Sequence, residues 1–296
     1  MTQISTPARP RTPALAALAV AVTILSWASA FPTIRLALHD LPPIPLAAGR
    51  FAVAAIAALL WLLIRRPPLP KGADLVRFAL CGLIGIASYN MLLNYGQQTV
   101  SAGAASFIVN SAPILTALLA VAVLKERIRL WGWLGTILSF AGVGIIASGQ
   151  PGGLHFSAGA VLVLGAAACS AVYFTLQKPM IARYGALPCT AYTLIAGALW
   201  LAPWLPEAVQ TLAPAPLDAW ARVIYLGLVP AALGYATWTY ALGAFGAARA
   251  ANFLYLVPPV ATALAFFWAG EVPSLTTLAG GAVVLTGVVL VNRFGR

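Results

Sequence analysis

Charge is what this sequence has least of. Of its 296 residues, 17 are Lys or Arg and 6 are Asp or Glu, so that charged residues make up 8% of the chain and hydrophobic residues 61%. A soluble domain carries about 25% charged residues, and a disordered chain lacks this much apolar surface. The composition therefore excludes both classes and indicates an integral membrane protein.

Cysteine and histidine are also scarce. The three cysteines, Cys81, Cys169 and Cys189, are far apart in apolar runs, and the two histidines, His39 and His155, fall between the apolar segments. No pair of these residues has metal-ligand spacing, and no catalytic set of His, Asp and Ser lies inside an apolar segment. We therefore expect no metal, no cofactor and no enzyme activity.

What the chain has in abundance is long apolar segments. A helix that spans a membrane needs about 20 mostly apolar residues, and ten such segments follow one another, at 14–38, 44–64, 76–95, 102–124, 131–149, 158–177, 187–205, 220–242, 250–269 and 275–292. The breaks between them are short and leave no room for a soluble domain. The first segment follows basic residues, as the apolar core of a secretory signal does. It is longer than the 7–15 apolar residues of such a core, so we expect an uncleaved helix.

The two halves of the chain are related in sequence. A shift of 145 residues aligns them without a gap and matches 15 of the 70 positions between 77 and 146, including the pairs Pro113/Pro258, Glu126/Glu271, Gly135/Gly280 and Gly142/Gly287. Each half, 1–149 and 150–296, holds five segments, and an odd number turns the second half upside down in the membrane. The predicted fold is an all-α integral membrane protein of ten transmembrane helices in two inverted five-helix repeats.

These residues carry a resemblance to a known family. Trp27 and Arg35 in the first segment, Arg50 at the start of the second, and the doubled Pro–Glu–Gly–Gly pattern resemble the drug/metabolite transporter superfamily, EamA type. The chain looks most similar to the YddG-type amino-acid exporters. The resemblance covers both halves and implies a ten-helix exporter of metabolites in the bacterial inner membrane, without specifying the substrate.

The net charge of +11 predicts orientation and not a nucleic-acid partner. With the N-terminus inside, 14 of the 17 cations fall on the cytoplasmic side. Cations concentrate on that side of membrane proteins. We therefore expect both termini in the cytoplasm.

Ionisable residues inside the membrane are the first filter for function. No carboxylate lies in the middle of a segment, which argues against a proton-coupled drug antiporter, and no Lys/Arg cluster lies there for a sugar phosphate. We therefore expect a small, neutral or zwitterionic substrate. Arg50 has two interpretations, as an interfacial anchor or as a contact for a substrate carboxylate. Glu271 is expected to close a helix end or to pair with a cation.

Uncharged polar residues mark the expected site. Asn90 and Asn94 share one helical face, and prolines stand near the other candidates: Pro113 after Asn110, and Pro258 and Pro259 after Asn252 and Tyr255. Proline frees carbonyls about one turn earlier, and such breaks in matching segments point to a transporter site. We assign Pro32, Pro113, Pro258 and Pro259 to gating or helix breaks. The alternative for the asparagines is adhesion between helices.

Aromatic residues complete the predicted site. Trp27, Tyr173 and Trp238 lie deeper than the interfacial belt in which membrane proteins collect such residues, and Tyr235 lies three residues before Trp238. They are predicted to line a cavity for an amphipathic substrate, with core or lipid-facing packing as the alternative. The small residues Gly135, Gly142, Gly280 and Gly287 are assigned to helix packing or to contact in a homodimer.

The leading hypothesis is a secondary transporter that exports small neutral or zwitterionic metabolites, with amino acids bearing aromatic or other apolar side chains as its substrates. Its partners would be that substrate and the lipid bilayer. A multidrug carrier, or a sugar-phosphate or nucleotide-sugar carrier of the same superfamily, is the alternative within transport. An intramembrane enzyme or flippase and a membrane sensor or scaffold are the alternatives from other classes.

Overall fold

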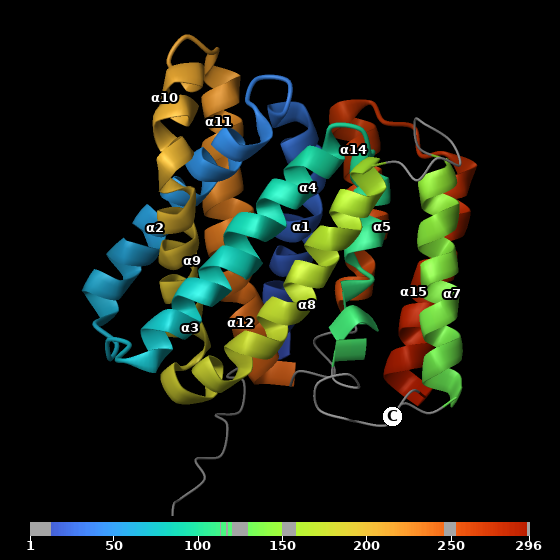
Figure 1. Cartoon of the computed structure of the whole chain (residues 1–296), viewed down its shortest axis with the longest axis horizontal. Coiled ribbons are helices and arrows are strands. Elements are labelled where there is room, and N and C mark those ends of the chain that lie inside the picture. The colour runs from blue at the N-terminus through green and yellow to red at the C-terminus, as the bar shows by residue number, and fades with distance from the viewer. Residues whose placement is uncertain are drawn as a thin grey trace, which may run out of the picture.

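Helices are the only regular structure in the part of the chain that the computed structural model describes, which comprises residues 13–112, 114–116, 118–119, 130–149, 158–245 and 253–294 (Figure 1). In the first half these are α1 (Pro13–Ala37), α2 (Pro43–Arg65), a rod made of α3 (Ala73–Cys81), η1 (Gly82–Ser88) and α4 (Tyr89–Gln97), then α5 (Ala102–Val109) and α7 (Leu130–Ser148).

The second half repeats this order. It contains α8 (Ala158–Tyr184), then α9 (Ala186–Leu201) leading through η2 (Ala202–Trp204) into α10 (Leu205–Leu212). A rod of α11 (Leu217–Leu226), η3 (Gly227–Leu233) and α12 (Gly234–Phe245) follows, and the chain ends in η4 (Leu254–Leu256), α14 (Val257–Ala269) and α15 (Leu275–Phe294).

Six of the described helical segments are long and apolar enough to cross a membrane on their own: Ala14–Ala37, Pro43–Arg65, Ala73–Gln97, Ala158–Tyr184, Ala186–Leu212 and Leu217–Trp238. The other four apolar helices, which match the remaining expected segments, are shorter. The all-helical membrane architecture is thus observed, whereas the count of ten spans stays a prediction.

Local chemistry explains where several helices begin and end. Proline opens α2, where its missing N–H costs nothing. The Ser101 side chain accepts a hydrogen bond from the Ala104 N–H and caps α5. Gly270 ends α14 in the left-handed conformation, at φ 64°, which only glycine adopts freely.

The internal repeat is visible in the helix boundaries. The π-helix η1 covers Gly82–Ser88 and the π-helix η3 covers Gly227–Leu233, which is a shift of 145 residues. The helices that follow them, α4 and α12, begin at Tyr89 and Gly234, which are separated by the same number. Packing is reciprocal, since α1 contacts α12 and α14 while α8 contacts α4 and α5.

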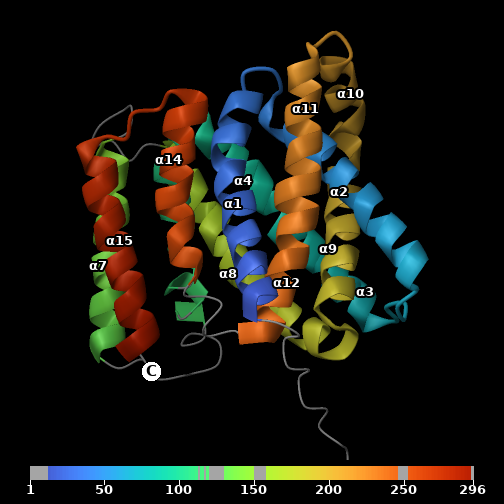
Figure 2. The ribbon, with the colours of Figure 1, turned by 180° about the vertical axis from the view of Figure 1, so that it is seen from behind.

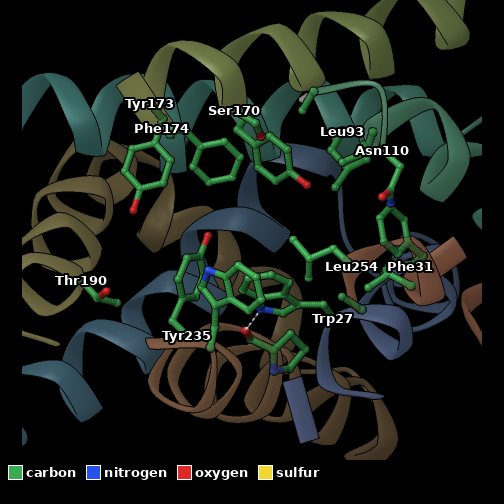
Figure 3. Close-up of a pocket in the computed structure, with 18 of the residues that line it drawn as sticks. Trp27, Phe31, Leu93, Asn110, Ser170, Tyr173, Phe174, Thr190, Tyr235 and Leu254 are labelled. Atoms are coloured by element: carbon green, nitrogen blue, oxygen red, sulfur yellow. Dashed lines mark hydrogen bonds between the residues drawn. The ribbon is translucent and has the colours of Figure 1, made fainter. Parts of the chain in front are cut away.

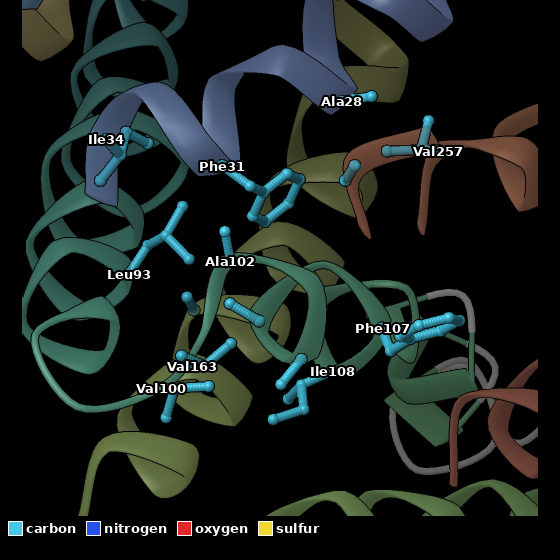
Figure 4. Close-up of a cluster of buried hydrophobic side chains, with 14 of the residues drawn as sticks. Ala28, Phe31, Ile34, Leu93, Val100, Ala102, Phe107, Ile108, Val163 and Val257 are labelled. Atoms are coloured by element: carbon cyan, nitrogen blue, oxygen red, sulfur yellow. The ribbon is translucent and has the colours of Figure 1, made fainter. Parts of the chain in front are cut away.

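Two groups of helices are distinguished by their packing. The main core lies between α1, α4, α5, α8 and α14, and its buried side chains include Phe31, Ile34, Leu93 and Val163 (Figure 4). The pair α7 and α15 lies side by side at one edge of the molecule (Figure 2). A side chain on Gly142 would approach the Gly280 carbonyl to 2.7 Å, so these glycines permit the pair to pack within one chain.

Candidate functional site

A cavity of about 250 Å³ lies between the two halves of the chain. In the first half, its lining comes from α1, α2, the rod of η1 and α4, and the end of α5. In the second half, it comes from α8, α9, the rod of η3 and α12, and the start of α14 with η4. The helices α7 and α15 contribute no described residue. The lining consists mainly of apolar and aromatic side chains with a few polar groups, as small-molecule sites do.

One wall of the cavity is aromatic. The Trp27 ring on α1 lies 5.4 Å from the Tyr235 ring and 5.5 Å from the Trp238 ring, both on α12. The Trp27 Nε1 donates a hydrogen bond of 3.1 Å to the carbonyl oxygen of Pro230 in η3, drawn as a dashed line in Figure 3. These contacts fix the tryptophan ring against the π-helix of the other half.

The opposite half makes a matching contact. Tyr173 on α8, 3% exposed, packs against Gly85 in η1 so closely that a Cβ atom on Gly85 would lie 2.4 Å from the tyrosine Cγ. Gly85 and Pro230 are separated by 145 residues. Each π-helix therefore receives an aromatic ring from the first helix of the other half, and π-helical turns are frequent at functional sites.

Arg50 is the charged group among the described residues that line the cavity. Its side chain is 7% exposed, its Nη1 donates to Asn90 Oδ1 at 3.0 Å, and its guanidinium carbon lies 4.9 Å from the centre of the Phe51 ring. Asn90 is held in turn, because its Nδ2 donates to the Ile86 carbonyl at 2.7 Å. The buried Nε of Arg50 has no hydrogen-bond partner among the described atoms.

No acidic side chain of the described residues lines the cavity to balance Arg50. The described acids are Asp40, Asp74, Glu207, Asp218 and Glu271, none of which is among the lining residues. A buried charge without a counter-ion is costly. The guanidinium is thus available to an anionic group that enters the cavity.

Seven of the sequence-predicted residues line this cavity: Trp27, Arg50, Asn110, Tyr173, Tyr235, Trp238 and Tyr255. They come from six places in the fold, namely α1, α2, the end of α5, α8, α12 and η4. The structure thus brings together residues that are as far apart in sequence as Trp27 and Tyr255, with Asn110 and Tyr173 labelled in Figure 3.

Two predicted residues lie outside the lining. Asn90 stands behind Arg50, and the fully buried Asn94 donates to the Pro43 carbonyl at 2.8 Å. Gln97 similarly donates to the Phe31 carbonyl at 3.0 Å. The contact of Asn94 joins α4 to α2, which is the adhesion between helices named above as the alternative for the asparagines.

The rod of α3, η1 and α4 turns a neighbouring face to the cavity, which carries Gly85, Tyr89 and Leu93. Tyr89 and Leu93 each stand one position before Asn90 and Asn94. The two asparagines share a buried face of α4, as their spacing predicts, but spacing alone does not give the direction in which that face points.

The predicted prolines behave differently from one another. Pro32 lies inside α1, which continues to Ala37 without a break. Pro258 and Pro259 open α14 after the short 3-10 turn η4, so the interruption of that segment precedes them. Asn252 and Pro113 lie outside the described residues.

Several lining residues were not predicted as site residues. Tyr89, Phe174, Ser170, Gln177 and Thr190 belong to this group. Ser170, Phe174 and Gln177 share one face of α8 with Tyr173 and could have been found by helical spacing. Tyr89 lies next to Asn90 in the sequence, on a face of α4 that the polar residues do not mark.

Ion pairs join the halves at both ends of the helices. At the end of α1, Arg35 Nε lies 3.3 Å from Glu271 Oε1, and Glu271 Oε2 accepts the Ala102 N–H at 2.8 Å. At the same end, Asp40 pairs with Arg222 of α11.

The opposite end has a corresponding contact. Asp74 on α3 pairs with Arg183 at the end of α8 and accepts a hydrogen bond of 2.8 Å from the Tyr184 hydroxyl. Arg77 lies 3.5 Å from the same carboxylate. Each end of the helical bundle is thus closed by ionic contacts between elements of different halves.

A helical membrane protein whose two similar halves enclose one cavity is typical of secondary transporters. The chain belongs to the EamA-like transporter family, whose model matches residues 14–148 and 157–293. This confirms the resemblance inferred from the sequence and makes the protein a multi-pass membrane transporter of the drug/metabolite transporter superfamily.

Relatives and a solved structure agree with this assignment. The chain is 40% identical to the probable terminal-alkyne amino-acid exporter of Streptantibioticus cattleyicolor, covering 93% of this chain and 92% of the relative. It is 36% identical to the uncharacterized transporter YdfC of Bacillus subtilis, over 88% and 86%. It is 26% identical to the probable amino-acid metabolite efflux pump of Salmonella typhimurium, over 93% of each. A crystal structure with 20% identity matches with a TM-score of 0.60 over 94% and 96% of the two chains, which shows a shared fold.

Proposed function

We propose that the protein is a secondary transporter that exports small neutral or zwitterionic metabolites, with amino acids bearing aromatic or other apolar side chains as substrates. One observation carries this proposal: the cavity combines the Arg50 guanidinium with a wall of aromatic rings. Two relatives named for amino-acid export support the substrate class.

The cavity offers a different group to each part of such a substrate. The Arg50 guanidinium would take the carboxylate through charge-assisted hydrogen bonds. Trp27, Tyr235 and Trp238 would cover the apolar side chain. Asn110 and Tyr255 add polar groups, and Asn90 acts by holding Arg50 in place.

We infer ten membrane spans in two inverted repeats. In Figure 1, α1 runs upward toward its connection with α2, whereas its counterpart α8 runs downward toward α9. The reciprocal packing of α1 and α8 on the other half supports the same relation. Two such halves can exchange inward-open and outward-open shapes around a fixed site.

The orientation follows from the ends of the helices. In Figure 2, α1 begins and α15 ends at the lower face. Seven described cations and one acid, Asp74, lie at helix ends on that face, whereas the upper face has two cations, Arg35 and Arg222, and four acids. By the positive-inside rule, we infer that the lower face is cytoplasmic. The bacterial relatives support the bacterial inner membrane as its location.

We infer that the cavity opens toward the lower face. Its lining extends to Ile181 and Ala186 at the lower junction of α8 and α9, whereas Ile34, Leu93 and Ala102 belong to the buried core cluster (Figure 4). The ionic contacts of Arg35 and Arg222 would keep the upper side closed. Export requires that these contacts open after the substrate has entered from the cytoplasm.

The test is exchange in liposomes that contain the purified protein. Labelled phenylalanine and leucine should exchange, whereas sugar phosphates and cationic drugs should not. Trp238→Ala and Asn110→Ala should lower exchange, while Ile137→Ala on the exposed side of α7 should leave it unchanged. Exchange of sugar phosphates or cationic drugs without amino acids would favour the alternative carriers and overturn the proposal.

A further inference from the structure

The cavity carries a cationic group for a carboxylate but, among the described residues, no anionic group for an ammonium. We propose that the transporter recognises the carboxylate end of its substrate alone. Monocarboxylates with an aromatic or apolar tail would then be substrates whether or not they carry the α-amino group. This inference rests on the proposed function and extends its substrate class beyond amino acids.

The first support is the way in which Arg50 is held. One guanidinium N–H is used by Asn90 Oδ1, and the ring of Phe51 covers the group at 4.9 Å. A guanidinium has five N–H donors, and the Nε donor is buried without a partner. Asn90 fixes the group in space without neutralising it, so the positive charge and its remaining donors are left for a ligand.

The second support is the placement of the acids. Four of the five described carboxylates are engaged at the ends of helices: Asp40, Asp74, Asp218 and Glu271 each pair with an arginine. The fifth, Glu207, lies in the first turn of α10, outside the cavity lining. None of these groups is placed to bind an ammonium beside Arg50.

Charge balance then favours the carboxylate. A monocarboxylate neutralises the buried guanidinium, and its tail adds no new charge. A zwitterion brings an ammonium close to Arg50, where like charges repel in a medium of low dielectric constant. Asn110 can partly offset this repulsion. Its Nδ2 donates to the Ser106 carbonyl, so its neutral Oδ1 is left to accept a hydrogen bond from the ammonium. The ammonium therefore contributes little to net affinity, and an amine without a carboxylate is repelled.

The test compares three ligands of one shape with the purified full-length protein. L-phenylalanine, 3-phenylpropionate and phenethylamine share the aromatic ring and differ in the groups at the other end. We expect 3-phenylpropionate to compete for binding within about threefold of phenylalanine or better, and phenethylamine to bind about 30-fold more weakly or not at all. Both acids should exchange in liposomes.

The outcomes separate the two proposals. Binding and exchange of phenylalanine without 3-phenylpropionate would show that the ammonium is required and would overturn this inference while leaving amino-acid export intact. If neither acid binds, the proposed function fails. Exchange of a phosphate ester in place of both acids would assign Arg50 to a phosphate and overturn the inference as well.

Two variants test the role of Arg50. Arg50→Gln should weaken both acids by about 30-fold, which corresponds to the loss of one buried charged contact. Asn90→Asp keeps nearly the same shape and provides a carboxylate for Arg50, so it should weaken both acids and reduce the discrimination against phenethylamine. Thermal unfolding of both variants establishes that they fold. Unchanged affinity for the acids in folded Arg50→Gln would make Arg50 an anchor and refute the inference.

Discussion

Gly85 offers a direct test of how the cavity is built. In Gly85→Ala the new Cβ atom would lie 2.4 Å from Cγ, 2.6 Å from Cδ2 and 2.9 Å from Cβ of Tyr173. Carbon atoms in contact are separated by about 3.5–4.0 Å. The tyrosine or the helix that carries it must therefore move by roughly 1–1.5 Å, which is the shortfall from that contact distance.

The expected cost follows from overpacking in a dense core. Inserting a methyl group at such a position lowers the free energy of unfolding by about 1–3 kcal/mol. Because Tyr173 lines the cavity, we also expect substrate affinity to fall by about fivefold or more, which corresponds to ~1 kcal/mol. Thermal unfolding in detergent measures the first effect, and competition binding with phenylalanine measures the second.

Gly165→Ala is the matched control. Gly165 lies on α8, the same helix as Tyr173, and its added Cβ would meet Leu92 at 3.4 Å, which is an ordinary contact. This variant should keep the stability and affinity of the parent protein. In a double-mutant cycle, Tyr173→Ala should remove part of the cost of Gly85→Ala, since the ring is then absent. If Gly85→Ala matched the control in both measurements, the close packing of Tyr173 on η1 would be refuted.

Three further changes test the aromatic wall and the ionic contacts. Trp27→Phe removes the donor to the Pro230 carbonyl but keeps an aromatic ring, so stability should fall by about 1 kcal/mol in thermal unfolding, and no loss would contradict the hydrogen bond. Glu271→Gln removes the charge that faces Arg35. In a variant with a cysteine introduced into the cavity lining, it should raise the labelling of that cysteine from the upper face about fivefold if the contact is worth ~1 kcal/mol. Asp74→Asn should instead lower labelling from the upper face, and the same change in both variants would contradict their assignment to opposite faces.

Hydropathy predicted the helices well because a bilayer tolerates little else. The expected segment 14–38 corresponds to α1 at Pro13–Ala37, and 275–292 corresponds to α15 at Leu275–Phe294. Membranes require long apolar runs with internal hydrogen bonds, so composition alone determines most boundaries. The exception is α10 (Leu205–Leu212), which lies between the expected segments 187–205 and 220–242. Proline at 206 and an acidic residue at 207 are typical of the first turn of a helix and could have predicted it.

The site was less predictable than the fold. The depth of Trp27, Tyr173 and Trp238 in the membrane predicts them as site residues, and all three line the cavity. Depth can be estimated from position along a segment, without knowledge of the direction in which the helix face points. Helical spacing places Asn90 and Asn94 on one face of α4 but does not say which face points into the cavity, where Tyr89 lies instead. The direction of a face depends on packing between the halves, such as that of Tyr173 on Gly85, which a local sequence pattern does not encode.

The two halves of the repeat contribute different chemistry to the cavity. The shift of 145 residues pairs Asn90 with Tyr235, Asn110 with Tyr255, and Arg50 with Ile195. The first half thus contributes a charge and amides where the second contributes aromatic rings or an apolar side chain. We expect the two halves to exchange inward-open and outward-open shapes during transport. This chemical difference would then bind an amphipathic molecule in one orientation. The single replacement Arg50→Gln would remove that difference in charge, so a folded variant should lose its preference for acids over neutral analogues of the same size. Retained preference would mean that the polarity of the cavity arises from other residues.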